Sequence, residues 1–264
     1  GNREEVAAGK MGIKTTVRTL TLFFIGRYPF VNAITLLLLL AERAEREKYP
    51  PLEPRIIYGH MAAFVLCGLS MGFNIFRKNG SMIHVGQLLY LAFSLYNSEN
   101  MHYKQWVLIR MASRIVGVAG IVLLYGYFTS QKPRNPQMKR LGETIFGLYV
   151  MGFTYGLVES PEDRNAFMSH IPGGEYALYI FAVLLATAAL CLLPGLFVHD
   201  AAQILLLLLI VYTAVIDCDL KYWTRKRGMD YWNQIRLITD HVCMIFGCLM
   251  VISCTTKKVY AKDD

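Results

Sequence analysis

The chain has 264 residues, of which 55% are hydrophobic and only 17% are charged. A soluble domain normally carries about 25% charged residues, so this composition excludes an ordinary soluble protein. The net charge is +8, but the Lys and Arg residues lie mainly in short connecting segments, where they orient spans and meet anionic lipid head groups. Nucleic acid is therefore not an expected partner.

The apolar residues form runs near the length of about 20 residues that a helix needs to cross a membrane. These runs are too long for barrel strands, so we expect an all-α, polytopic membrane protein with about eight transmembrane helices. The charged segment Ala41–Lys48 follows the first run in place of a small-residue cleavage site, so the first span is expected to stay in the mature protein. The distribution of basic residues slightly favours both termini in the cytosol. The predicted spans are roughly 17–41, 56–76, 82–97, 105–128, 141–158, 174–196, 200–217 and 233–254.

Two stretches far apart in the chain, Trp106–Val116 and Trp232–Val242, are similar. Each opens a long apolar segment, and Trp, Ile, Arg and Val recur at matching places. The pattern predicts two tandem four-helix units, residues 1–130 and 141–264. Between them, the two prolines and four cations of residues 131–140 predict a polar loop. The alternative is that span starts look alike because Trp and Arg are favoured at membrane interfaces.

The repeat puts Arg114 and Asp240 at equivalent places. A charge at the bilayer centre costs about 2.5–3.5 kcal/mol on insertion scales, so it tends to find a partner within the bundle. We expect Arg114 to pair with Asp240 or with Asp217, either as a static ion pair that fixes helix packing or as part of a binding or transport site. The candidate intramembrane polar cluster is Arg27, Gln87, Arg110, Arg114, Gln203, Asp217, Arg236 and Asp240.

Patterns typical of enzymes are weak. Gly68–Gly72 matches GxSxG around Ser70, but that motif needs a strand-to-helix turn, and here it falls inside an expected helix. A face of small residues that lets helices approach closely is the simpler interpretation, and Gly152 and Gly156 predict a second such face. The six histidines are isolated, and the sequence has no phosphate-binding loop or dinucleotide fingerprint. We therefore expect a non-enzymatic protein with no catalytic residue, cofactor or metal.

One short helix is predicted from its start signals. Ser160 suits the cap, Pro161 the first position, and Glu162 and Asp163 the helix dipole. The helix should end near His170 and serve either as an interfacial spacer, with Phe167 and Met168 on its apolar side, or as a docking surface.

Several motifs recur along most of the chain. They are Arg27–Phe30, Ala41–Glu45, Ile109–Arg114, Glu162–Arg164, His170–Glu175, Ala201–Leu205 and Tyr231–Gln234. Together they resemble the transmembrane protein 101 family of multi-pass proteins. The resemblance implies a membrane protein that is loosely associated with promoting inflammatory NF-κB signalling and has no assigned catalytic residues. More remotely, the layout is similar to DoxX-like proteins and Surfeit locus protein 4 cargo receptors, which implies a cargo receptor or assembly chaperone.

Two functions are expected from these features. The first is a non-enzymatic accessory subunit, assembly factor or cargo receptor that acts through a membrane-protein partner. The alternative is a small transporter or a lipid- or anion-binding protein with a polar pocket between the two halves. The residues expected to line this pocket are Arg110, Arg114, Gln87, Gln203, Asp217 and Asp240. Either would lie in the bilayer of the endoplasmic reticulum and secretory pathway or of the plasma membrane.

Overall fold

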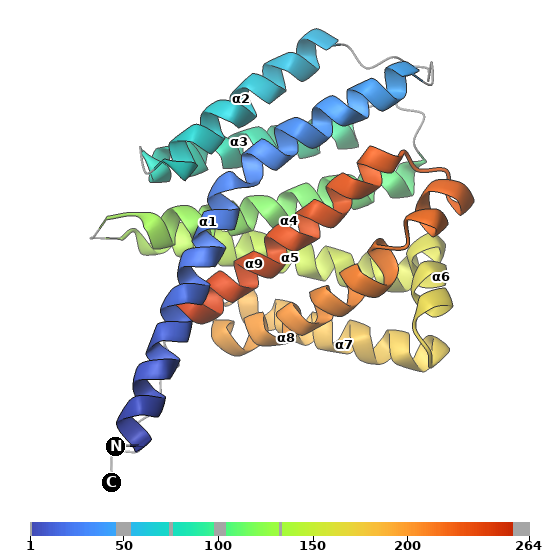
Figure 1. Ribbon diagram of the computed structural model, residues 1–264. Coiled ribbons are helices and arrows are strands. Elements are labelled where there is room, and N and C mark those ends of the chain that lie inside the picture. The colour runs from blue at the N-terminus through green and yellow to red at the C-terminus, as the bar shows by residue number, and fades with distance from the viewer. Residues whose placement is uncertain (1, 46–53, 74–75, 98–103, 132–133, 256–264) are drawn as a thin grey trace.

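The computed structural model describes residues 2–45, 54–73, 76–97, 104–131 and 134–255, with the side chains of residues 2–11, 13 and 14 left out. Within these ranges all regular structure is helical (Figure 1). The elements are α1 (Asn2–Glu45), α2 (Pro54–Gly72), α3 (Arg77–Tyr96), α4 (Gln105–Thr129), α5 (Pro136–Glu159), α6 (Pro161–His170), α7 (Gly174–Leu192), α8 (Val198–Tyr212), the π-helical turns η1 (Thr213–Asp217) and η2 (Tyr222–Lys226), and α9 (Tyr231–Cys254).

Each of the eight predicted spans corresponds to one long helix. Seven helices in the described part of the chain are long and apolar enough to cross a membrane: α1, α2, α4, α5, α7, α8 continued by η1, and α9. The eighth, α3, is helical but does not belong to that set, because its sequence carries more polar residues. The all-α, polytopic fold class is therefore confirmed.

The predicted linker at residues 131–140 is partly wrong, because α5 already begins at Pro136. The Asn135 side chain accepts a hydrogen bond of 3.0 Å from the Gln137 amide, so it caps the helix. Pro136 then occupies the first turn, where a missing amide hydrogen costs nothing. Both residues are as typical of a helix start as of a loop.

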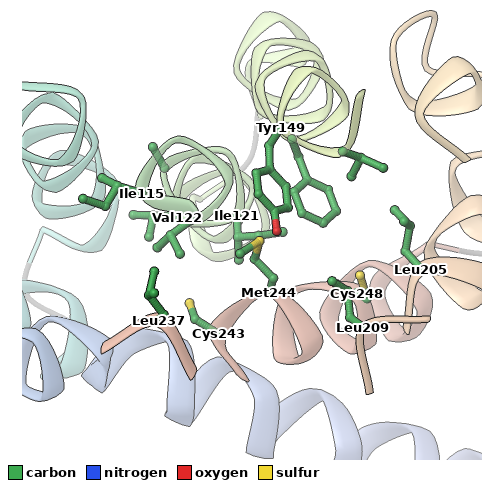
Figure 2. Packing of buried hydrophobic residues seen from close by; sticks show 14 of the residues in the cluster. Ile115, Ile121, Val122, Tyr149, Leu205, Leu209, Leu237, Cys243, Met244 and Cys248 are labelled. Carbon is green, nitrogen blue, oxygen red and sulfur yellow. The ribbon is translucent and has the colours of Figure 1, made fainter. Parts of the chain in front are cut away.

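Helix α4 lies at the centre of the bundle and packs against α3, α5 and α9. It is apolar on almost all sides, as expected for a helix surrounded by protein. Figure 2 shows side chains from four helices meeting there, including Ile121 of α4, Tyr149 of α5, Leu209 of α8 and Met244 of α9. Gly117 makes room for this contact, since a Cβ atom at that position would come within 2.8 Å of the Tyr149 ring and the Met244 sulfur.

Helices α4 and α9, which carry the two similar stretches, pack on each other. Helix α4 also packs on α5, and α9 packs on α1, so the long helices of both halves join one buried core. Because contacts across the proposed boundary are as extensive as those within each half, the division into two four-helix units stays a prediction of the sequence pattern.

Close contact between α4 and α5 depends on Gly120. In Gly120→Ala, the new Cβ would lie 2.8 Å from the backbone nitrogen of Phe146 and 3.0 Å from the carbonyl oxygen of Gly142. Backbone atoms cannot move aside, so the two helices must separate, and we expect the free energy of unfolding to fall by about 1–3 kcal/mol. Thermal unfolding of the purified protein in detergent measures this loss.

The matched control is Gly86→Ala in α3, where no neighbour lies within 4 Å of the new Cβ. Alanine is the better helix former by up to about 1 kcal/mol, so this variant should be unchanged or slightly more stable. Equal melting temperatures for the two variants would contradict the packing of α4 on α5.

Candidate functional site

Asp217 is the centre of a buried group of charges. It is the last residue of η1, the π-helical turn that continues α8. A π-helical turn is wider than an α-helical one, so it changes the direction of the side chains that follow it. Asp217 itself is 0% exposed.

Two arginines of α4 share the Asp217 carboxylate. Arg110 and Arg114 are four residues apart and so lie on one face of the helix. The Asp217 Oδ1 atom accepts hydrogen bonds from Arg110 Nη2 at 2.6 Å and from Arg114 Nη2 at 2.9 Å. Arg114 Nη1 also donates to the carbonyl oxygen of Leu237 in α9, at 2.8 Å. The Asp217 carboxylate therefore links α4 to the end of α8, and the hydrogen bond from Arg114 to Leu237 links α4 to α9.

His241 of α9 completes this group. Its Nδ1 atom lies 2.7 Å from Asp217 Oδ2, and its Nε2 atom lies 2.8 Å from the hydroxyl oxygen of Tyr149 in α5. The Thr213 hydroxyl is 3.2 Å from Nδ1. We call Arg110, Arg114, Asp217 and His241 the central ion cluster. It connects α4, α5, α9 and the end of α8.

The central ion cluster is almost sealed from its surroundings. Arg114 is 1% exposed, His241 is 0% exposed and Arg110 is 6% exposed. Charged side chains inside a membrane protein are expensive and are held by partners of opposite charge or by hydrogen bonds. The cluster meets this requirement because one carboxylate, that of Asp217, contacts both guanidinium groups and the His241 imidazole.

The structure brings together three of the eight residues predicted from the sequence: Arg110, Arg114 and Asp217. Of the two partners expected for Arg114, Asp217 is the one it contacts. Asp240 instead accepts a hydrogen bond from the Tyr28 hydroxyl of α1. Consecutive residues of a helix point about 100° apart, so α9 presents His241 to the cluster and Asp240 to α1.

The remaining four predicted residues lie elsewhere. The Arg27 guanidinium is 3.6 Å from the ring centroid of Phe23, and Gln87 donates a hydrogen bond of 3.0 Å to the carbonyl oxygen of His60. Gln203 is exposed, and Arg236 lies one turn before Asp240 on the same face of α9. These four residues do not belong to the central ion cluster.

A partly enclosed cavity of about 330 Å³ lies beside the central ion cluster, between α4, α5 and the start of α6. Its inner wall includes Arg110 and Arg114, so the cluster forms part of its lining. The polar lining residues are Arg110, Ser113, Arg114, Glu159, Ser160 and Asp163. The others are Trp106, Ile109, Gly152, Phe153, Tyr155 and Gly156.

This position corrects two predictions. Gly152 and Gly156 were expected to let a neighbouring helix approach, but nothing lies within 4 Å of a Cβ atom built on either, and both border the cavity. The predicted pocket between the halves was also expected to include Gln87, Gln203, Asp217 and Asp240, which are not among its lining residues. By contrast, Gly68 of the serine motif does allow close packing, since its Cβ would meet the Phe30 ring at 2.8 Å.

Helix α6 closes one end of the cavity. Its predicted limits are confirmed, with Ser160 Oγ accepting a hydrogen bond of 3.5 Å from the Asp163 amide at the N-terminus. Phe167 was expected on an interfacial side of α6 but is fully buried. The centroid of its ring lies 5.2 Å from that of Phe181 in α7. The apolar side of α6 therefore faces the bundle.

Asp163 on α6 faces Arg110 across the cavity, with Oδ1 3.4 Å from Nη1. Neither atom has a hydrogen-bond partner among the described residues. Burial raises the pKa of the Asp163 carboxyl group, although Arg110 lowers it. The guanidinium carbon of Arg110 also lies over the ring of Trp223 in η2, 3.8 Å from its centroid.

The model of the TMEM101 protein family matches residues 12–255. The chain belongs to the TMEM101 family. This membership and the seven apolar helices make it an integral, multi-pass membrane protein and confirm the family resemblance. The remoter likeness to DoxX-like proteins stays a prediction. No solved structure matches the chain.

Sequence reasoning missed the positions of His241 and Asp163 in this TMEM101 family protein. Asp163 had a sufficient explanation as a helix-start residue, and His241 sits next to the more conspicuous Asp240. Within the described ranges, no group of three or more His, Cys, Asp or Glu side chains could hold a metal ion. What remains is a site built from charge pairs and hydrogen bonds beside a cavity.

Removing the central carboxylate should unfold the bundle. In Asp217→Asn, the two arginines lose their shared counterion while staying buried, a change that typically costs about 3–5 kcal/mol. We expect the detergent-purified variant to melt at a much lower temperature or to aggregate. Asp219→Asn is the control, because the Asp219 side chain is 42% exposed and exposed ion pairs contribute little. Wild-type stability of Asp217→Asn would contradict the central ion cluster.

Proposed function

We propose that this TMEM101 family protein binds an amphipathic membrane molecule whose polar head group enters the cavity between α4, α5 and α6. The observation that carries the proposal is the lining of that cavity. Buried Arg110 and Arg114 form its inner wall, while Ile109 and Tyr155 are 47% and 69% exposed at its border. A mouth bordered by exposed apolar side chains suits a ligand that arrives from the bilayer.

The depth of the cavity supports this proposal. Trp106 lies at the first turn of α4, and tryptophan is enriched at the membrane interface. Arg110 and Arg114 follow Trp106 by four and eight residues, which is about 6 and 12 Å along a helix. The head group of a lipid in the same leaflet lies near the interface that Trp106 marks. The lipid therefore needs only a small displacement for its head group to reach the two arginines.

The size of the cavity also fits a head group. Small-molecule pockets usually measure about 300–1,000 Å³, and this one, at about 330 Å³, is near the lower end. It has room for a head group but not for two long acyl chains. The chains would remain outside, against exposed apolar residues such as Ile109.

The sequence also predicted an accessory subunit, assembly factor or cargo receptor that acts through protein partners, with a link to inflammatory signalling. No contact in the described part of the chain favours one partner surface, so this role and the choice between secretory pathway and plasma membrane stay predictions. Affinity purification followed by mass spectrometry tests them directly.

Filling the cavity should remove the ligand without harming the fold. In Gly156→Leu, the new side chain enters space that no neighbour occupies within 4 Å of its Cβ. We expect the affinity for lipid to fall by at least about tenfold, since the leucine occupies the head-group position. Native mass spectrometry of the protein, titrated with lipid in detergent, measures the bound fraction.

The matched control is Gly59→Leu in α2, because Gly59 also has no neighbour within 4 Å of a Cβ atom and does not line the cavity. This variant should bind lipid like the wild type. Retention of wild-type lipid binding by Gly156→Leu, or an equal loss in Gly59→Leu, would rule out the cavity as the site.

A further inference from the structure

Side chains of both charge signs line the cavity. Two cations, Arg110 and Arg114, and two carboxylate residues, Glu159 and Asp163, line the same space. The arginines come from α4, whereas Glu159 ends α5 and Asp163 lies in the first turn of α6. The cavity therefore has a cationic wall and an acidic wall on different elements.

Three polar atoms of the lining have no hydrogen-bond partner among the described residues. Two are donors, Nη1 of Arg110 and Nε1 of Trp106, and one is an acceptor, Oδ1 of Asp163. Only 6% of Arg110 is exposed, so bulk solvent does not satisfy its Nη1 donor. Arg110 Nη1 and Asp163 Oδ1 lie 3.4 Å apart as an ion pair without a hydrogen bond, so each can still bond to a ligand, and Trp106 Nε1 has no hydrogen-bond partner. Because buried polar groups are normally hydrogen-bonded, these atoms suit a ligand that supplies both an acceptor and a donor or a cation.

Aromatic rings line the same cavity as the carboxylate groups. Trp106, Phe153 and Tyr155 all line the cavity. Ring faces attract cations, and sites for quaternary ammonium groups commonly combine several rings with a carboxylate. The acidic wall is therefore suited to an ammonium group, including one that cannot donate hydrogen bonds.

We propose that the head group is zwitterionic, with a phosphodiester facing Arg110 and Trp106 Nε1, and an ammonium group facing Glu159, Asp163 and the aromatic rings. This inference rests on the proposed function and names its ligand class, the phosphocholine and phosphoethanolamine lipids. A purely anionic head group would meet two carboxylates, and a purely cationic one would meet two guanidinium groups. Each would leave one wall unpaired, which is how a site discriminates against the wrong charge.

The acidic wall is held in place by contacts on both sides of α6. Arg164 forms an ion pair with Glu175 of α7, and Arg227 Nη2 lies 3.4 Å from the carbonyl oxygen of Glu162. Asp163 is thereby fixed opposite Arg110. Asparagine has the size and shape of aspartate, and the Asp163 side chain is 14% exposed beside the cavity, so Asp163→Asn is the conservative variant. Its melting temperature in detergent shows that it is folded before lipid is added.

The test compares dioleoyl phosphatidylcholine with dioleoyl phosphatidylglycerol in one native mass spectrometry titration. We expect the wild type to favour the choline lipid by at least about tenfold. Glu159→Gln/Asp163→Asn should lose this preference or reverse it, because only the arginines then remain as lining charges. The single variant Glu159→Gln, at an exposed position, should show a smaller change in the same direction. Glu162→Gln is the control on the same helix, since Glu162 does not line the cavity.

Equal or tighter binding of phosphatidylglycerol by the wild type would overturn the zwitterion inference and leave the proposed function standing. An unchanged preference in a folded Glu159→Gln/Asp163→Asn would overturn it as well. Failure of both lipids to bind would overturn the inference and the proposed function together. Water-soluble glycerophosphocholine carries the same head group without acyl chains, so it distinguishes a lipid ligand from a soluble one. It should bind more weakly than the lipid, and equal binding would contradict a membrane-derived ligand.

Discussion

The Asp217 carboxylate is the shared counterion of two arginines that are almost fully buried. Its carboxylate binds Arg110 and Arg114 of α4 and contacts His241 of α9, which in turn contacts Tyr149 of α5. Buried ion pairs seldom add much net stability, because losing hydration offsets the attraction, yet a missing partner is very costly. The group therefore acts chiefly as a constraint: α4, α5, α9 and the end of α8 are held in one relative arrangement.

The same constraint places one side of the buried Arg110 guanidinium in the cavity wall. Asp217 occupies Nη2 of its guanidinium group and Trp223 covers one face, while Nη1 points towards Asp163 without a hydrogen bond. This contact is an ion pair of 3.4 Å, so Nη1 can still donate a hydrogen bond to a ligand. An arginine that Asp217 holds at one nitrogen, and that keeps a donor available at the other, is preorganised for a ligand. This connects the stability of the bundle to the proposed lipid site.

Much of the fold follows from local signals in the sequence. Long apolar runs predict the spans because lipid leaves backbone groups no other partner, and Ser160 and Pro161 predict the start of α6 through capping. The partner of Arg114 was narrowed to two residues because charges in the spans are few. The choice between Asp217 and Asp240 depends on the π-helical turn and on the rotation of α9, which no local pattern encodes. Likewise, Pro136 fits both a loop and a helix start, and nothing near Asp163 in the chain reveals that it faces Arg110.

The most direct test of this account is an electron cryomicroscopy map of the protein in nanodiscs of mixed phosphatidylcholine and phosphatidylglycerol. We expect Asp217 to contact both Arg110 and Arg114, and head-group density to fill the cavity beside the Arg110–Asp163 pair, with acyl chains leaving past Ile109. A map in which Asp217 lies apart from the arginines, or in which α6 packs onto α4 and leaves no cavity, would contradict it.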